Sequence, residues 1–213
     1  MAIIKTYIYN ADEATSSQNI LNYLQANAVP DYFDSVELDG NCVLCKVGEH
    51  ELLKIYPNLT QSGGGYQVYT TTGTALWINS NSSYMRHAYA YKCKHGISIT
   101  FIDTSATAAM LTIAKTKAGV TAIVAPNSLS VSSAAAVSTL CAVGLNSGPP
   151  AAMSAKNSIT PLTVLAPVPT SGPEEDYVDG VYFLPFCQTR ETGLLDVNGT
   201  KYLSNGIWCI KDE

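Results

Sequence analysis

The chain has 213 residues, enough to bury a sizeable core as one large β domain or as two small ones. Charged residues make up only 14% of it, and the net charge of −5 with scattered basic residues argues against nucleic-acid binding through a basic surface. Polarity comes instead from serine, threonine, asparagine and glutamine, a mixture more typical of β-rich extracellular or particle-surface proteins than of helical cytosolic enzymes.

The N-terminus shows no secretory signal, because Met1 to Lys5 are followed at once by polar residues, without an apolar segment or a cleavage pattern. No apolar run approaches the ~20 residues that a membrane-spanning helix requires. The alanine-rich segment 131–145 is too short and too rich in serine and threonine. We therefore expect no membrane insertion and folding in a cytoplasm, or export by a route that the sequence does not reveal.

The N-terminal part of the chain predicts a strand followed by a helix. Residues 2–9 form a short strand pattern, and Ser16-Ser17 supply N-cap residues for a helix that runs to about Ala26. This helix carries an apolar stripe formed by Ile20, Leu21 and Leu24. Pro30 ends the connection, and a run of strands follows, with hairpin turns at residues 39–41 (Asp-Gly-Asn) and 48–50 (Gly-Glu-His).

The middle of the chain predicts half-buried antiparallel strands. After a flexible loop at residues 62–65, the pattern indicates strands at 66–72 and 74–79 and a long alternating strand at 84–94. Gly96 then turns the chain into a further strand, in which one side is lined by Ile97, Ile99 and Phe101.

The composition and patterning of the sequence change from about residue 104. Residues 104–126 predict a hairpin around Lys117-Ala118-Gly119 with two β arms, although alanine and methionine at 106–111 also suit a helix. Residues 128–143 fit either an amphipathic helix or a buried strand, and periodicity does not decide between them. Six of the ten prolines follow, so residues 146–180 predict extended loops around a strand at 159–166.

The closing stretch, residues 180–213, predicts a compact β meander. Asn198-Gly199 is its strongest signal, because a type I′ hairpin turn requires positive φ at both positions. The resulting register pairs Val197 with Thr200, Asp196 with Lys201, Leu195 with Tyr202 and Leu194 with Leu203. A second turn at Asn205-Gly206 would place Leu203 opposite Trp208 and Tyr202 opposite Cys209. Since both faces are apolar, we expect each to be covered by a second sheet or by another subunit.

These patterns together predict a mainly β protein with antiparallel sheets, of sandwich or meander type, and one short N-terminal helix. Two regions are suggested, a β-rich region with the helix at residues 1–103 and a β region with proline-rich loops at 104–213. The boundary is soft, and a single domain is the alternative.

Six cysteines, at positions 42, 45, 93, 141, 187 and 209, are expected to be free thiols in a chain of this size without a signal peptide. Cys42, Cys45, Cys93 and His95 have a spacing that could hold a structural zinc ion. If residues 42–45 form a plain strand, however, the two sulfur atoms point to opposite faces, so we favour core cysteines and predict no metal and no cofactor.

No cluster of residues predicts catalysis. His87 and His95 would lie roughly 26 Å apart along a strand, too far to act together, and the sequence has no G-x-S-x-G elbow. The carboxylates fall mostly in turns, at Asp39, Asp103, Glu174, Glu175 and Asp176. Asp176-x-x-Asp179-Gly180 could contribute to a calcium site, but it lacks the ligand series of an EF-hand loop. We therefore predict a protein without enzymatic activity.

The thirteen tyrosines are the remaining functional signal. Five of them are expected in strands close together in sequence: Tyr66, Tyr69, Tyr84, Tyr89 and Tyr91. Tyrosine provides a large contact area and is enriched at interfaces, so these residues could form an inter-subunit seam or a platform on which sugars stack. Ordinary core positions, selected for strand propensity, explain them equally well.

Two passages resemble a known class of proteins. They are YFDSVELDGNCVLCKVGEHELLKI, residues 32–55, and GVYFLPFCQTRETGLLDVNGTKYLSNGIWCIKD, residues 180–212, and they are similar to uncharacterised virion or tail-associated proteins of phages and prophages in Gram-positive gut bacteria. The resemblance implies a structural particle component that folds in the host cytoplasm, resides in the virion and has no catalytic residues.

The resemblance also implies partners. We expect a homo-oligomer, with a trimer favoured, or assembly with other particle proteins through two-sided apolar β units. The alternative is a carbohydrate-binding or adhesin-like module that contacts host surface glycans through exposed tyrosines and Trp77. A hydrolase is the third and weakest hypothesis.

Overall fold

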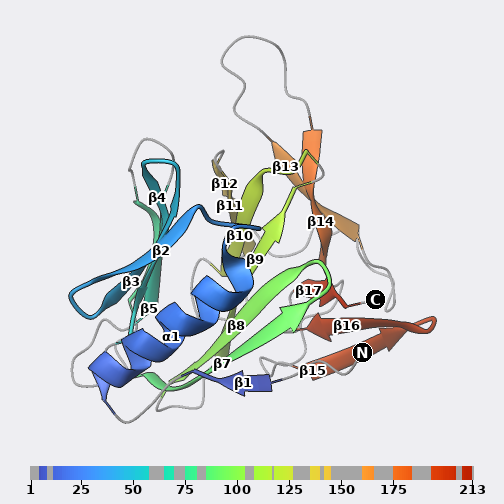
Figure 1. Ribbon diagram of the computed structural model, residues 1–213. Helices are drawn as coiled ribbons and strands as arrows, with labels where there is room; N and C mark the ends of the chain where they lie inside the picture. The colour runs from blue at the N-terminus through green and yellow to red at the C-terminus, as the bar shows by residue number, and fades with distance from the viewer. Residues whose placement is uncertain are drawn as a thin grey trace.

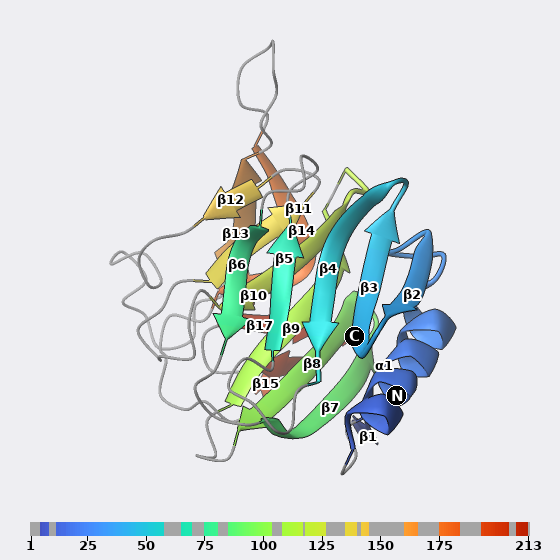
Figure 2. The same cartoon turned by 90° about the vertical axis from the view of Figure 1, so that its left-hand side faces the viewer.

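The computed structural model describes residues 5–8, 12–57, 65–69, 75–80, 85–103, 108–116, 118–126, 135–139, 142–144, 160–165, 175–183, 193–204 and 208–212. They form three antiparallel sheets and one helix, which confirms the predicted mainly β fold with a single N-terminal helix. The sheets are stacked in three layers, with the largest in the middle (Figures 1 and 2). Within these ranges, no helix is long and apolar enough to cross a membrane.

The central sheet has seven strands in the order β1-β7-β8-β9-β10-β11-β12. Its strands are β1 (Lys5–Tyr7), β7 (Met85–Cys93), β8 (Gly96–Asp103), β9 (Ala108–Lys115), β10 (Thr121–Pro126), β11 (Ala135–Thr139) and β12 (Ala142–Gly144). From β7 onward the chain is a simple meander, and β1 is added at the edge beside β7. The segment 108–115 is therefore a strand, as the sequence favoured, and the ambiguous segment forms strands where it is described.

The N-terminal sheet has the order β2-β3-β4-β5-β6, so consecutive strands are neighbours throughout. Its strands are β2 (Ser35–Asp39), β3 (Cys42–Val47), β4 (His50–Tyr56), β5 (Gly65–Tyr69) and β6 (Ala75–Ser80). Both predicted hairpin turns are confirmed, and their glycines, Gly40 and Gly48, have φ of +59° and +58°. Only a residue without Cβ adopts this conformation at low cost.

The helix α1 (Glu13–Ala28) begins earlier than the serines predict. Its N-cap is Asp12, whose carboxylate accepts a hydrogen bond from the backbone N–H of Thr15 at 2.7 Å. The N-cap prediction of Ser16-Ser17 was wrong, because both serines lie inside the helix and their buried hydroxyls donate to the carbonyls of Asp12 and Glu13. Such a back-bond replaces the lost solvation of a helical serine.

The main core lies between the N-terminal and central sheets, and α1 closes one side of it (Figure 2). The helix contributes the predicted stripe of Ile20, Leu21 and Leu24. The facing sheets contribute alternate residues of each strand, among them Val43, Cys45, Ile55, Val68, Ile97, Ile99, Phe101, Leu111, Ile113 and Ile123. This period of two along each strand is what a sheet with one core-facing side requires.

The C-terminal sheet has the order β13-β14-β17-β16-β15 and covers the opposite face of the central sheet (Figure 1). Its strands are β13 (Thr160–Leu165), β14 (Glu175–Phe183), β15 (Gly193–Val197), β16 (Thr200–Ser204) and β17 (Trp208–Lys211). A bridge between Thr116 and Val178 links the two sheets, and the side chain of Ile210 lies against Gly96.

The closing meander is confirmed at its first turn and wrong at its second. All four predicted pairs between β15 and β16 are present, and Asn198 and Gly199 have φ of +53° and +82°. Leu203, however, pairs with Ile210 instead of Trp208, and Tyr202 pairs with Lys211 instead of Cys209. The connection is longer than the two-residue turn assumed, and because the shift is two residues, each side chain keeps its expected face.

The proposed division near residues 103–105 stays a prediction. The strands on either side of it, β8 and β9, are paired neighbours in the central sheet.

Candidate binding surfaces

The cysteines and His95 that suggested zinc are not brought together. Cys42 is half-buried on β3, whereas Cys45, three residues further on, is fully buried in the core, as alternation along a strand predicts. Cys93 is buried at the end of β7 in a different sheet. No three histidine, cysteine or acidic side chains in the described ranges lie close enough to hold a metal ion. Cys141 and Cys187 lie outside these ranges.

Burial also disfavours the thiolate form of these cysteines. It raises the pKa of Cys93 and of Cys209 to about 12, and it raises the pKa of Cys45 still further. The pKa of the half-buried Cys42 is raised as well, mainly by desolvation. Since the thiolate is the nucleophile and the metal ligand, thiols that remain protonated at neutral pH suit packing better than chemistry.

His95 joins two sheets. It lies in the turn between β7 and β8, and its Nδ1 is 3.0 Å from a carboxylate oxygen of Asp179 on β14. The imidazole ring lies directly over Gly180, where a Cβ would be 2.3 Å from its Cγ. Asp179 was predicted only as part of a candidate calcium motif, and its pairing with His95 was not predicted, because the two residues are 84 positions apart. The side chains of Asp103, Glu174, Glu175 and Asp176 lie outside the described part.

The five candidate tyrosines do not form one surface. Tyr66 is buried in the main core, with its ring centroid 5.7 Å from that of Phe101. Tyr89 and Tyr91 lie on the central sheet, and the ring centroid of His87 is 6.1 Å from that of Tyr89. Tyr69 lies on the N-terminal sheet, while Tyr84 and the side chain of Trp77 are outside the described part. Alternation along the strands and the order of the layers place these residues in different environments. Their closeness in sequence therefore does not predict a shared surface.

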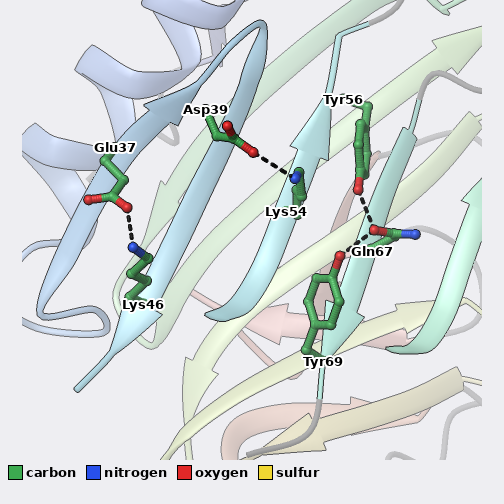
Figure 3. Close-up of polar contacts among 7 residues, drawn as sticks. All are labelled: Glu37, Asp39, Lys46, Lys54, Tyr56, Gln67 and Tyr69. Carbon is green, nitrogen blue, oxygen red and sulfur yellow. Dashed lines mark hydrogen bonds and ion pairs between the residues drawn. The ribbon is translucent and has the colours of Figure 1, made fainter. Parts of the chain in front are cut away.

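The face of the N-terminal sheet that is turned away from the core carries an ordered set of polar side chains, drawn in Figure 3. We call it the outer face, and it is formed by Glu37, Asp39, Lys46, Lys54, Tyr56, Gln67 and Tyr69. Lys54 binds Asp39 at 3.0 Å, and Lys46 binds Glu37. Leu44, between Glu37 and Lys54 in the register, is only 4% exposed, so long polar side chains shield the apolar centre of this face.

Tyr56 and Tyr69 both donate a hydrogen bond to the same atom, the side-chain oxygen of Gln67. We call these three residues the Tyr–Gln–Tyr strip. Tyr56 lies opposite Gly65 in the register, and Gly65 is four residues from Tyr69 along β5. The two tyrosines are therefore ~13 Å apart along the strand direction. Since their hydroxyls nonetheless meet at one oxygen, the two rings lie along the sheet and point toward each other (Figure 3).

A second exposed feature lies at the edge of the C-terminal sheet. Four apolar residues lie side by side across this sheet on the face that covers the central sheet: Val181, Ile210, Leu203 and Leu194. Their exposed fractions are 0%, 0%, 2% and 71% in that order. The first three residues of this row are therefore buried, whereas the fourth, Leu194 on the edge strand β15, is exposed. On the other face, Cys209 is buried and the rings of Tyr182 and Tyr202 pack edge to face, with centroids 5.9 Å apart.

No protein-family model matches the chain, and comparison with curated proteins and with solved structures finds no similar protein.

Proposed function

We propose that this protein is a structural or interaction protein without catalytic activity, and that it assembles with further copies of itself through the edge of the C-terminal sheet. The observation that carries the proposal is the row of apolar residues that ends at Leu194, which is 71% exposed. An edge strand presents unpaired N–H and C=O groups, so it can bind another strand directly. A large exposed apolar side chain on such a strand adds a hydrophobic contact.

The opposite outer layer has an edge strand that is covered by another part of the chain. The edge strand β2 also carries an exposed leucine, Leu38, which is 41% exposed. There, however, α1 lies beside the strand, and the amide of Gln25 donates a hydrogen bond to the backbone carbonyl of Val36 at 2.9 Å. Among the described residues, no comparable bond reaches the backbone of β15. The contrast favours β15 as the edge that meets a partner.

The test is the molar mass in solution. Size-exclusion chromatography with light scattering at high micromolar concentration should give an oligomer, with a trimer favoured, for the wild-type protein. Leu194→Asp places a charge in the contact and should lower the mass toward that of a monomer. Leu38→Asp is the matched control, because it changes the exposed leucine of β2, an edge strand in the opposite outer layer. It should leave the mass unchanged. A wild-type monomer, or an unchanged mass for Leu194→Asp, would contradict the proposal.

We also propose that the assembly is a phage or prophage particle, with the protein folded in the host cytoplasm and resident in the virion. This part rests on the sequence resemblance of residues 32–55 and 180–212. Genes for portal, capsid or tail proteins beside the coding gene would support it, and a neighbourhood of metabolic genes would count against it.

A second candidate function is carbohydrate binding, as in an adhesin-like module. The specific observation in its favour is the Tyr–Gln–Tyr strip on the outer face, because it combines aromatic rings with a fixed amide.

A further inference from the structure

We propose that the outer face of the N-terminal sheet is a binding site for a neutral oligosaccharide, and that the Tyr–Gln–Tyr strip is its recognition element. This inference rests on the second candidate function and is independent of the edge of β15, which lies in the opposite outer layer (Figure 1).

The charges of the outer face argue against anionic ligands. Four of its charged side chains are combined in two ion pairs, Glu37 with Lys46 and Asp39 with Lys54. A further carboxylate, that of Glu51, belongs to the residue opposite Lys46 in the register. The lysines of this face are thus matched or outnumbered by carboxylates, and the face offers no basic surface for phosphate or carboxylate groups. A polar ligand without negative charge fits here, and a neutral oligosaccharide is such a ligand.

The amide of Gln67 is held in one orientation. Because its oxygen accepts hydrogen bonds from Tyr56 and Tyr69, its nitrogen is directed away from both hydroxyls (Figure 3). The amide thus presents two N–H donors beside two tyrosine hydroxyls, a group that can both donate and accept. Donors and acceptors fixed at close spacing match the vicinal hydroxyl groups of a sugar ring, which act as both. Binding to a preorganised set of groups loses less side-chain entropy than binding to mobile ones.

The two tyrosine rings add apolar contact of the right shape. They extend ~13 Å along the sheet, and both are partly exposed. The ammonium group of Lys54 lies 5.5 Å from the centre of the Tyr56 ring, which further fixes that ring. An aromatic ring suits the C–H face of a pyranose, and the two tyrosines together span a length that accommodates more than one sugar ring. This is why we infer a short oligosaccharide instead of a single sugar.

The test is calorimetric titration of the full chain with short neutral oligosaccharides built from glucose, galactose, mannose or N-acetylglucosamine, with sialylated oligosaccharides as the charged comparison. At least one neutral compound should bind. Tyr69→Ala should weaken it about tenfold or more, as truncation of an aromatic anchor does. The double variant Tyr56→Phe/Tyr69→Phe keeps both rings but frees the amide of Gln67, and it should weaken binding about two- to tenfold.

The matched control is Tyr202→Ala, which removes a half-exposed tyrosine from the C-terminal sheet and should leave the affinity unchanged. Urea midpoints show whether each variant is folded, and the double phenylalanine variant preserves packing if Tyr69→Ala does not fold. The proposal is overturned if no neutral oligosaccharide binds, if only sialylated ones bind, or if Tyr202→Ala weakens binding as much as Tyr69→Ala. It is also overturned if variants of the strip change the oligomer mass instead of sugar binding, since a second copy would then occupy this face.

Discussion

Gly180 is the position at which a single added methyl group should be most informative. It lies within β14 at a β-bulge, because Tyr177 and Tyr182 pair with Thr163 and Pro161, so that only one residue of β13 faces four of β14. Its φ is +69°, and a Cβ at this position would lie 2.3 Å from Cγ and 2.4 Å from Cβ of His95. Gly180→Ala therefore meets a backbone penalty and a steric one.

The size of the effect follows from these two penalties and from the loss of the contact that they disturb. An L-residue in the left-handed region costs roughly 1–2 kcal/mol. Forcing a side chain into occupied space costs about 1–3 kcal/mol. Displacing His95 also breaks its contact with Asp179, a partly exposed pair that is worth at most about 1 kcal/mol. The free energy of unfolding should thus fall by about 2–6 kcal/mol, a large part of the ~5–15 kcal/mol of a typical domain.

Urea denaturation followed by circular dichroism measures this loss, and two controls separate its parts. Gly48→Ala adds a Cβ at a φ of +58° with no atom within 4 Å, so it should show only the backbone penalty, roughly 1–2 kcal/mol. In a His95→Ala background, the loss of free energy of unfolding caused by Gly180→Ala should fall to the same value, because the obstructing ring is absent. If Gly180→Ala costs no more than Gly48→Ala, or if His95→Ala does not relieve it, the packing of His95 on Gly180 is refuted.

Three further predictions concern the core and its thiols. Gly96→Ala should destabilise the protein by about 3 kcal/mol or more, because the added Cβ would lie 2.2 Å from the backbone oxygen of Ile113. A urea midpoint close to that of the wild type would contradict this contact. Brief alkylation of the folded protein near pH 8 should modify Cys42 well before Cys45, Cys93 or Cys209, because only Cys42 among these four is not buried. Peptide mass spectrometry identifies the modified residues. Equal labelling of all four would contradict the burial of the other three. The protein should also lose stability in alkali: the pKa of Cys93 and of Cys209 is raised from 9.0 to about 12 in the folded state. These thiols therefore favour folding fully below pH 9, and this contribution is lost as the pH rises toward 12 because the unfolded chain releases its protons first, at about 1.4 kcal/mol per unit of pKa difference. A free energy of unfolding that stays constant over this pH interval would contradict the burial of the two thiols.

The local features of this chain were predictable because they depend on neighbouring residues. Asn198-Gly199 sets a turn with positive φ, so the pairs from Val197–Thr200 to Leu194–Leu203 follow by counting. The apolar stripe of α1 and the alternation in β3 and β8 follow from the helical and strand periods in the same way. The second turn of the closing meander was misplaced because only a tight two-residue connection fixes a register from sequence.

The sites depended on contacts between distant residues. The pair of His95 with Asp179 and the meeting of Tyr56 with Tyr69 at Gln67 leave no periodic trace, because each depends on how strands and layers are placed side by side. The five candidate tyrosines are close in sequence, yet alternation and the layer order place them in different environments.

The sequence by itself determined a mainly β chain with antiparallel sheets and one helix, and it predicted an apolar closing meander that would be covered by other parts of the protein or by a partner. These properties follow from side-chain periodicity and turn chemistry, which act over a few residues. Only the tertiary structure decided what provides the cover. The central sheet shields Ile210 and Leu203 but not Leu194, which lies at an edge strand and remains 71% exposed. Exposure at an edge depends on how far one layer overlaps the next, and no local pattern encodes that distance.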